Sequence, residues 1–205
     1  MHSTPELKRA TKTPREPGLG RTLLVLGAIM LVTIVVLLLM GRPAICTCGT
    51  IKLWHGEVVS AENSQHVSDW YTFSHVTHGF LFYWLAWALS RGVTRLRPVR
   101  IRLMLAVIVE CGWEILENTD FIIERYREAT IALDYFGDSV LNSTFDVVFM
   151  SLGFLIASRL PAMATLTIAV AFEVFMAVMI RDNLALNILM LVWPIEAVKT
   201  WQGAG

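Results

Sequence analysis

The sequence predicts an all-α protein, a polytopic transmembrane helical bundle of about six spans. Hydrophobic residues make up 55% of the 205-residue chain, and its mean hydropathy is +0.58, a composition typical of membrane proteins. Apolar segments long enough to cross a bilayer recur with short polar connections, at about residues 22–40, 71–90, 103–122, 139–158, 161–180 and 184–200.

The first segments divide the chain into a tail and one membrane domain. Residues 1–20 are polar, rich in basic side chains and without an apolar period, so they predict a disordered cytoplasmic tail. A cleaved signal peptide would have a shorter apolar core than residues 22–40, and Ile45 stands where a lipoprotein cleavage site needs a small residue. We therefore expect an uncleaved anchor, a transmembrane helical domain over residues 21–205, and an outer loop over residues 41–69.

Basic residues orient the bundle, because short cytoplasmic loops of membrane proteins are enriched in Lys and Arg. They cluster in the tail and in one short connection, at Lys8, Arg9, Lys12, Arg15, Arg21, Arg91, Arg95, Arg97, Arg100 and Arg102. Arg159 and Lys199 fall on the same side of a six-span topology. The expected arrangement is N-in and C-in, in a bacterial inner membrane. Because the formal net charge is zero, a nucleic-acid partner is not expected.

Two of the three cysteines form the motif Cys46-Thr47-Cys48 in the outer loop, and Cys111 lies in the third span. A disulfide across one intervening residue is strained, and a metal bound by two thiolates needs further ligands. The motif is compatible with a free or partner-linked thiol pair, with an intramolecular disulfide, or with a metal or redox site.

The third span carries acids on one face. At 100° per residue, Glu110, Glu114, Glu117 and Asp120 fall within an arc of roughly 120°. An ionised carboxylate facing lipid costs roughly 2.5 to 3.5 kcal/mol. This face is therefore predicted to line a protein interior or a wet cavity, with Asp120 solvated at the membrane surface.

Two other spans carry matching polar stripes. His75 and His78 are three residues apart on the second helix, and the fourth begins with polar residues at intervals of four. In the predicted topology all three stripes lie in the outer half of the membrane. The candidate catalytic residues are His75, His78, Glu114, Glu117, Asp138, Asn142 and Asp146, and Glu173 on the fifth span is expected near them.

Three chemistries fit this set. His75, His78 and Glu114 form a candidate metal site, suited to Zn or another divalent ion, although H-x-x-H alone is a weak motif. Metal-free acid–base catalysis needs one carboxylate of raised pKa, a second that stays ionised, and a histidine. A proton path along Glu110, Glu114 and Glu173 would indicate a proton-coupled transporter.

A structural interpretation competes with these, because polar side chains also join transmembrane helices by hydrogen bonds worth about 0.6 to 2 kcal/mol each. It would make the protein a non-catalytic assembly factor. Burial of so many ionisable groups together favours a functional site. The prediction is a membrane-embedded hydrolase or transferase that acts on a lipid-linked or envelope substrate from the periplasmic side; the bilayer is its partner, and its oligomeric state stays open.

The stretches FSHVTHGFLFYW and ECGWEILENTDFIIERYREATIALDYFGDSVLNSTFDV resemble an uncharacterised family of bacterial multi-pass inner-membrane proteins. The likeness covers roughly residues 20 to 200. The helical His, the Trp-Glu pair and the D-x-x-x-N-x-x-x-D-x6-G pattern from Asp138 to Gly153 are distantly similar to the VanZ-like superfamily. That resemblance implies an envelope-related role and identifies no catalytic residue.

Overall fold

The computed structural model describes residues 14–130 and 134–203, and in these ranges all regular secondary structure is helical. The predicted all-α class is confirmed. The helices are α1 (Leu19–Leu39), α2 (Thr72–Gly92), η1 (Thr94–Leu96), α3 (Val99–Glu117), α4 (Asp120–Ala129), α5 (Val140–Ala157), α6 (Ala162–Ile180), α7 (Leu184–Val192) and α8 (Glu196–Gly203). Most of the predicted tail lies outside the described residues.

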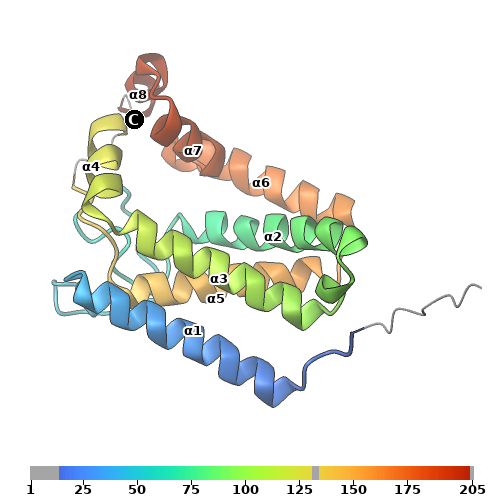
Figure 1. The fold of residues 1–205 in the computed structure, drawn as a ribbon. Helices are drawn as coiled ribbons and strands as arrows, with labels where there is room; N and C mark the ends of the chain where they lie inside the picture. The colour runs from blue at the N-terminus through green and yellow to red at the C-terminus, as the bar shows by residue number, and fades with distance from the viewer. Residues whose placement is uncertain (1–13, 131–133, 204–205) are drawn as a thin grey trace, which may run out of the picture.

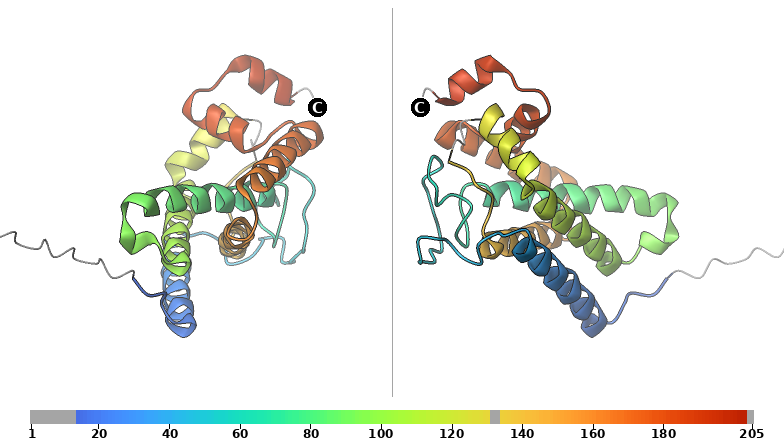
Figure 2. Two further views of the ribbon diagram at one scale, coloured as in Figure 1. Left: turned by 90° about the vertical axis from the view of Figure 1, so that its right-hand side faces the viewer. Right: turned by 60° about the vertical axis from the view of Figure 1, so that its left-hand side comes forward.

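The long helices α1, α2, α3, α5 and α6 form the body, and the short helices α4, α7 and α8 gather at one end (Figure 1). α2 packs along α5, and α1 packs against α3. The outer loop, α4, α7 and α8 lie together at the end where α1 finishes, whereas η1 and the start of α1 lie at the opposite end (Figure 2). The apolar core fills the half of the bundle near η1, with Phe80, Leu103, Met150 and Phe154 at its centre.

Three helices, α1, α5 and α6, are long and apolar enough to cross a membrane by length and composition. α1 and α6 also expose many large apolar side chains, including Leu24, Leu31, Met163 and Val178. Water does not solvate such surfaces favourably, whereas lipid does. The protein is therefore a membrane protein. α2 and α3 are of similar length but carry the histidines and acids of the second and third segments.

The predicted sixth span is wrong. Residues 184–200 form two short helices, interrupted between Val192 and Glu196 around Pro194. A nine-residue helix is only about 14 Å long, less than half of the hydrocarbon thickness. The side-chain amide of Gln202 donates to Asp182 at 3.1 Å, and Lys199 bonds the carbonyl of Glu128 on α4. The segment thus turns back to the end at which α6 finished, instead of continuing to the opposite end of the bundle as a sixth span would.

The third helix ends earlier than expected, at Glu117 instead of residue 122. The amide of Asn118 turns back to the Glu114 carbonyl at 3.0 Å, and the Thr119 hydroxyl bonds the Leu116 carbonyl at 2.6 Å. These bonds satisfy carbonyls that a longer helix would have used. Asp120 therefore begins α4, and its exposed carboxylate pairs with Arg42 at 3.3 Å. It does not share the acidic face of α3, although it is solvated as predicted.

The outer loop is anchored to the start of α5. The first amides of α5 need acceptors because they have no partner within the helix, and the loop supplies them. The amide of Val140 donates to the Pro43 carbonyl at 2.9 Å, and that of Leu141 to Ala44 at 3.1 Å. The Ser139 side chain caps the helix by accepting from the Asn142 amide at 3.1 Å. The loop and α5 are thus one structural unit.

α2 and α5 approach most closely at two glycines. A Cβ atom at Gly79 would lie 2.1 Å from the Met150 carbonyl oxygen, and one at Gly153 would lie 2.2 Å from the Val76 carbonyl oxygen. Both distances are far inside van der Waals contact. Small residues at helix crossings let backbones meet in this way in membrane proteins. The approach holds the polar halves of the two helices together.

We predict that Gly79→Ala or Gly153→Ala lowers the free energy of unfolding by about 2 to 3 kcal/mol, because the added methyl group forces the backbones apart. Thermal unfolding in detergent measures this loss. Gly112→Ala on α3 is the matched control, since a Cβ there meets nothing within 4 Å. Equal stability of all three variants would show that the crossing tolerates separation.

Candidate functional site

A cavity of about 320 Å³ opens among α2, α3, α4, α5 and α7. Its lining has two characters. One side is apolar, with Leu81, Phe82, Val109, Ile188 and Leu191. The other side carries ionisable and hydroxyl groups, contributed by Tyr71, His75, His78, Glu110, Glu117, Tyr126, Tyr135, Asp138 and Asp146. The predicted convergence of the three polar stripes is therefore found in the structure.

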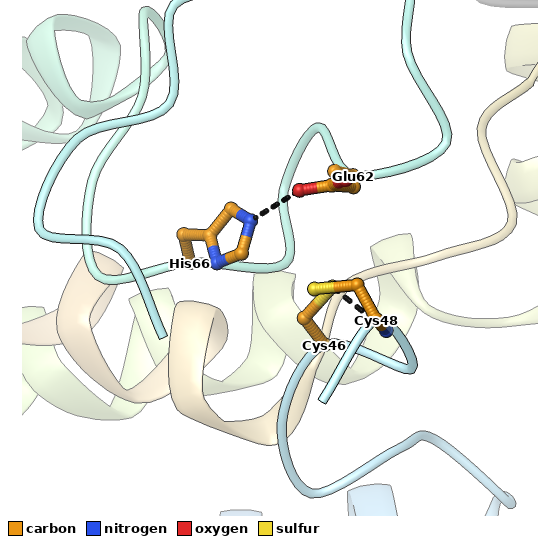
Figure 3. A group of neighbouring side chains, drawn as sticks. All are labelled: Cys46, Cys48, Glu62 and His66. Carbon is orange, nitrogen blue, oxygen red and sulfur yellow. Dashed lines mark hydrogen bonds and ion pairs between the residues drawn. A yellow bond between two sulfur atoms is a disulfide. The ribbon is translucent and has the colours of Figure 1, made fainter. Parts of the chain in front are cut away.

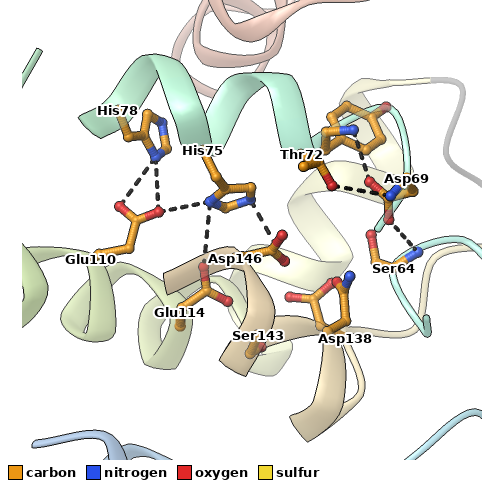
Figure 4. A network of polar contacts seen from close by, with 12 residues as sticks. Ser64, Asp69, Thr72, His75, His78, Glu110, Glu114, Asp138, Ser143 and Asp146 are labelled. Atoms are coloured by element: carbon orange, nitrogen blue, oxygen red, sulfur yellow. Dashed lines mark hydrogen bonds and ion pairs between the residues drawn. The ribbon is translucent and has the colours of Figure 1, made fainter. Parts of the chain in front are cut away.

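His75 and His78 both turn toward Glu110 (Figure 4). Nδ1 of His75 donates to Oε1 of Glu110 at 2.7 Å, and Nδ1 of His78 lies 3.2 Å from each oxygen of the same carboxylate. Glu110 is fully buried, and the His78 ring stacks on Phe82. The two histidines thus share one acid. Their partner is one helical turn before Glu114, the predicted one.

Glu114 and Asp146 lie on the other sides of the His75 ring (Figure 4). Oε1 of Glu114 is 3.7 Å from Nδ1, and Oδ2 of Asp146 is 3.7 Å from Nε2. Both contacts exceed hydrogen-bonding distance. His75 is therefore surrounded by three carboxylates from two helices, of which only Glu110 is hydrogen-bonded to it.

The second half of the polar lining centres on Asp138, just before α5. Its carboxylate accepts from the Asn118 amide at 2.8 Å and from the Tyr135 hydroxyl at 3.0 Å. Burial raises the pKa of Asp138 to about 6, although these two hydrogen bonds lower it. The carboxyl group of Glu117 contacts the Tyr126 hydroxyl. A carboxyl group that titrates near neutral pH is suited to general acid–base chemistry.

Asn142 lines the cavity, but its amide is engaged with the outer loop. Nδ2 donates to the His66 carbonyl at 2.9 Å, and its backbone amide is held by the Ser139 cap. A buried amide with these partners fixes the loop above the cavity. Its predicted catalytic role stays a prediction.

Glu173 does not join the polar lining. Its carboxylate accepts from the backbone amides of Leu184 at 3.2 Å and Ala185 at 3.0 Å, the first residues of α7. A carboxylate at a helix N-terminus satisfies free amides and the positive end of the helix dipole. Glu173 was expected near the polar stripes from its depth in the fifth span alone, which does not show this capping role.

Several lining residues were outside the predicted catalytic set. Glu110 was assigned only to a proton path, although its position four residues before Glu114 already placed it on the same face. Tyr126 and Tyr135 flank the cavity because α4 folds over it, and the Tyr126 hydroxyl also donates to Asn187 at 2.7 Å. The described part of the segment from Glu124 to Tyr135 thus covers one side of the cavity.

A second cluster lies in the outer loop, where Cys46 and Cys48 form a disulfide (Figure 3). This is one of the three predicted possibilities for the motif. His66 is fully buried beside it, with Nε2 3.0 Å from Oε2 of Glu62. Lys52 also binds Glu62, and together these partners lower the pKa of Glu62 to about 2.

Asp182 connects two other segments of the chain at the edge of the site. Its carboxylate accepts from the Tyr71 hydroxyl at 2.9 Å and from the Gln202 amide at 3.1 Å. Burial raises the pKa of Asp182 to about 6 in spite of these donors. Since the folded-state pKa lies above the unfolded value of 3.8, protonation stabilises the fold, and the gain appears as pH falls through 6.

We predict that lowering the pH from 7 to 5 raises the contribution of Asp182 to the free energy of unfolding by roughly 1 kcal/mol. Asp182→Asn keeps an acceptor for Tyr71 but cannot titrate. Thermal unfolding of both proteins at the two pH values measures the difference between them. A difference that is the same at pH 5 and pH 7 would contradict this.

Comparison with known proteins relates the chain to a family of unknown function. Its profile, described as protein of unknown function (DUF2585), matches residues 37–204. A UPF0314 protein of Rhizobium etli is 56% identical over 176 residues, 86% of this chain and 88% of the relative. A UPF0314 protein of Novosphingobium aromaticivorans is 56% identical over 191 residues, 92% and 96% of the two chains. No solved structure matches. The distant VanZ-like resemblance stays a prediction.

Proposed function

The chain belongs to the DUF2585 family, whose relatives are called UPF0314 proteins, and we propose that it is a membrane-embedded enzyme. It acts on an amphiphilic, lipid-linked or envelope substrate, as a hydrolase or transferase. One observation carries the proposal, namely that a single cavity has an apolar wall and a wall of ionisable groups.

The apolar wall suits an acyl or prenyl chain. Leu81 and Phe82 extend it along α2, and Ile188 and Leu191 extend it along α7. A chain seated there places its polar end at His75 and Asp138, which line the opposite wall. Ligand sites of this kind combine an apolar body with a few placed polar groups. A soluble polar substrate would leave the apolar wall unused.

The polar wall contains both partners of acid–base catalysis. His75 is oriented by its 2.7 Å hydrogen bond to Glu110, which fixes the ring and stabilises its charged form when it accepts a proton. Asp138, with a pKa of about 6, exchanges protons near neutral pH. Tyr126 and Tyr135 add hydroxyl donors toward the same cavity. These groups suit attack by water or by a hydroxyl group on a carbonyl or phosphoryl centre.

The distribution of basic residues supports a periplasmic opening. Arg91, Arg95 and Arg97 lie at the end of the bundle that carries η1, opposite to α4 and the outer loop. By the positive-inside rule the η1 end is cytoplasmic. With five helices of spanning length and α7 and α8 at the outer surface, the N-terminal side of α1 is inside and residue 203 is outside.

We predict that a membrane-impermeant thiol reagent, applied to intact inner-membrane spheroplasts, labels Val59→Cys but not Thr94→Cys. Both positions are exposed, Val59 in the outer loop and Thr94 in η1. Permeabilised cells provide the control, because both variants should then react. The wild type should stay unlabelled, since Cys111 is buried and the other two cysteines form the disulfide. Labelling of Thr94→Cys alone in intact spheroplasts would show that the η1 end is periplasmic and would contradict the proposed orientation.

The transporter alternative is less well supported. A path through Glu110, Glu114 and Glu173 needs the third acid near the first two, and Glu173 instead caps α7. The polar groups also gather near one end of the bundle, whereas the half near η1 is filled by the apolar core. A continuous proton path would require ionisable groups in both halves.

The enzyme proposal is tested by deleting the gene in its host and profiling envelope lipids. We predict that a lipid-linked species accumulates, and that plasmid-borne wild type restores the profile. His75→Gln and Glu110→Gln should restore less than a tenth of it, because a lost acid–base partner typically costs a factor of about 100 to 10,000 in rate.

Asp120→Asn is the matched control, since that carboxylate is exposed and pairs with Arg42 outside the cavity. It should complement fully. Membrane abundance and the unfolding temperature are measured for every variant. If stable, abundant His75→Gln and Glu110→Gln proteins complement like wild type, the enzyme proposal fails and the assembly-factor interpretation gains support.

A further inference from the structure

Three carboxylate oxygens within the bundle lack hydrogen-bond partners among the residues that the structure describes. They are both oxygens of Glu114 and Oδ1 of Asp146. Glu114 is fully buried, and Asp146 is 4% exposed. Among the described residues no Lys or Arg lies within ion-pair distance of either acid. A buried anion without a partner is costly, so such oxygens indicate a cation or a proton.

The spacing around His75 fits ligands that share one ion. Two donors bound to Zn²⁺ at about 2.1 Å in a tetrahedral site lie about 3.4 Å apart. Nε2 of His75 and Oδ2 of Asp146 are 3.7 Å apart, which is too long for a hydrogen bond and close to that separation. One ligand atom from each of His75, Glu114 and Asp146 lies within 4.8 Å of the others.

Glu110 supplies the orientation that such a site needs. Because its carboxylate accepts from Nδ1 of His75 at 2.7 Å, the neutral ring carries its proton on Nδ1. The lone pair of Nε2 then faces Asp146. A histidine ligand normally donates its other ring nitrogen to a carboxylate in this way. Without an ion or a proton between them, this lone pair and the Asp146 carboxylate would repel each other.

We propose that His75, Glu114 and Asp146 bind one divalent metal ion, with Zn²⁺ as the best match. The imidazole and the two carboxylates form a three-ligand set, and the cavity leaves a fourth position for water or substrate. This ligand set differs from the sequence prediction, because Asp146 replaces His78. His78 instead shares Glu110 with His75. Two negative ligands also match the charge of a divalent ion.

The site deepens the proposed function, since its catalytic meaning rests on that function, whereas metal binding itself does not. With the ion bound, His75 would serve as a ligand, and a coordinated water would take the place of His75 in acid–base catalysis. A bound Zn²⁺ would lower the pKa of a coordinated water toward about 7 and supply a nucleophile at neutral pH. His78 lies across Glu110 from the site, 3.2 Å from its carboxylate.

The test measures metal content without activity. Detergent-purified protein is stripped with a chelator, reloaded with zinc chloride, desalted and analysed by elemental mass spectrometry. Wild type and Asp120→Asn should hold about one Zn per chain. Glu114→Gln combined with Asp146→Asn should hold less than a tenth of that. Glu110→Gln should weaken zinc binding about 10- to 100-fold, the usual effect of losing an orienting partner.

Two further samples separate this site from the outer-loop cluster and from a defect in folding. Cys46→Ser with Cys48→Ser removes the two loop sulfurs, which form a candidate metal-binding group with Glu62 and His66 outside the cavity. It should keep one Zn per chain, and loss of zinc there would move the site to the loop and overturn the proposal. Cobalt-loaded wild type should show visible absorption without a sulfur charge-transfer band. This measurement uses the wild-type protein, so it does not depend on whether a carboxylate variant folds.

If wild type holds no more zinc than the double carboxylate variant, the proposed metal site is wrong, and a shared proton is the cation between these groups. Failure of the metal site can be distinguished from failure of the proposed function. A zinc-free protein whose His75→Gln variant still fails to complement is a metal-free enzyme. A zinc-binding protein whose Glu114→Gln variant complements has the metal site without the proposed catalysis.

Discussion

The contact between α2 and α5 at Gly79 and Gly153 is the constraint on which the rest of the structure depends. α2 carries His75 and α5 carries Asp146. Either residue would be costly in an apolar environment unless the two helices were in contact. The glycines remove the side chains that would separate the backbones. Because His75 is one turn from Gly79, the closest backbone contact lies directly beside the ionisable cluster. Packing and chemistry therefore reside on the same faces of these helices.

The two ends of the bundle have different tasks. At the η1 end, apolar side chains such as Phe80 and Met150 fill the space between helices. At the other end the helices separate around the cavity, and α4, α7 and the outer loop cover it. The covering segments are held by polar bonds, for example from Asn142 to the His66 carbonyl and from Tyr126 to Asn187. The apolar end stabilises an arrangement that the polar end alone would not hold together.

The all-helical class and the convergence of the polar faces could be predicted from periodicity, because a helix of known pitch fixes which residues share a face. The failures have local causes. The Asn118 side chain ended the acidic helix by bonding the Glu114 carbonyl, so Asp120 left the face on which its spacing had placed it. Pro194 interrupted an apolar segment of sufficient length, and Glu173 capped the N-terminus of α7 instead of joining the other acids. Such side-chain to backbone bonds leave little trace in a hydropathy pattern. The roles of the site residues follow neither from periodicity nor from packing, since geometry brings groups together without naming the substrate.

The pairing of α2 with α5 also has a consequence for biogenesis. α2 leaves the ribosome well before α5, with α3 and α4 between them, so its histidines enter the translocon without Asp146 and without the glycine that receives Gly79. Until the later helix arrives, α2 is a poorly hydrophobic segment with no completed neighbour. α3 supplies the first of the histidines' partners, because its Glu110 lies beside both imidazoles. The hairpin of α2 and α3 is therefore the smallest unit in which each histidine has an acid partner.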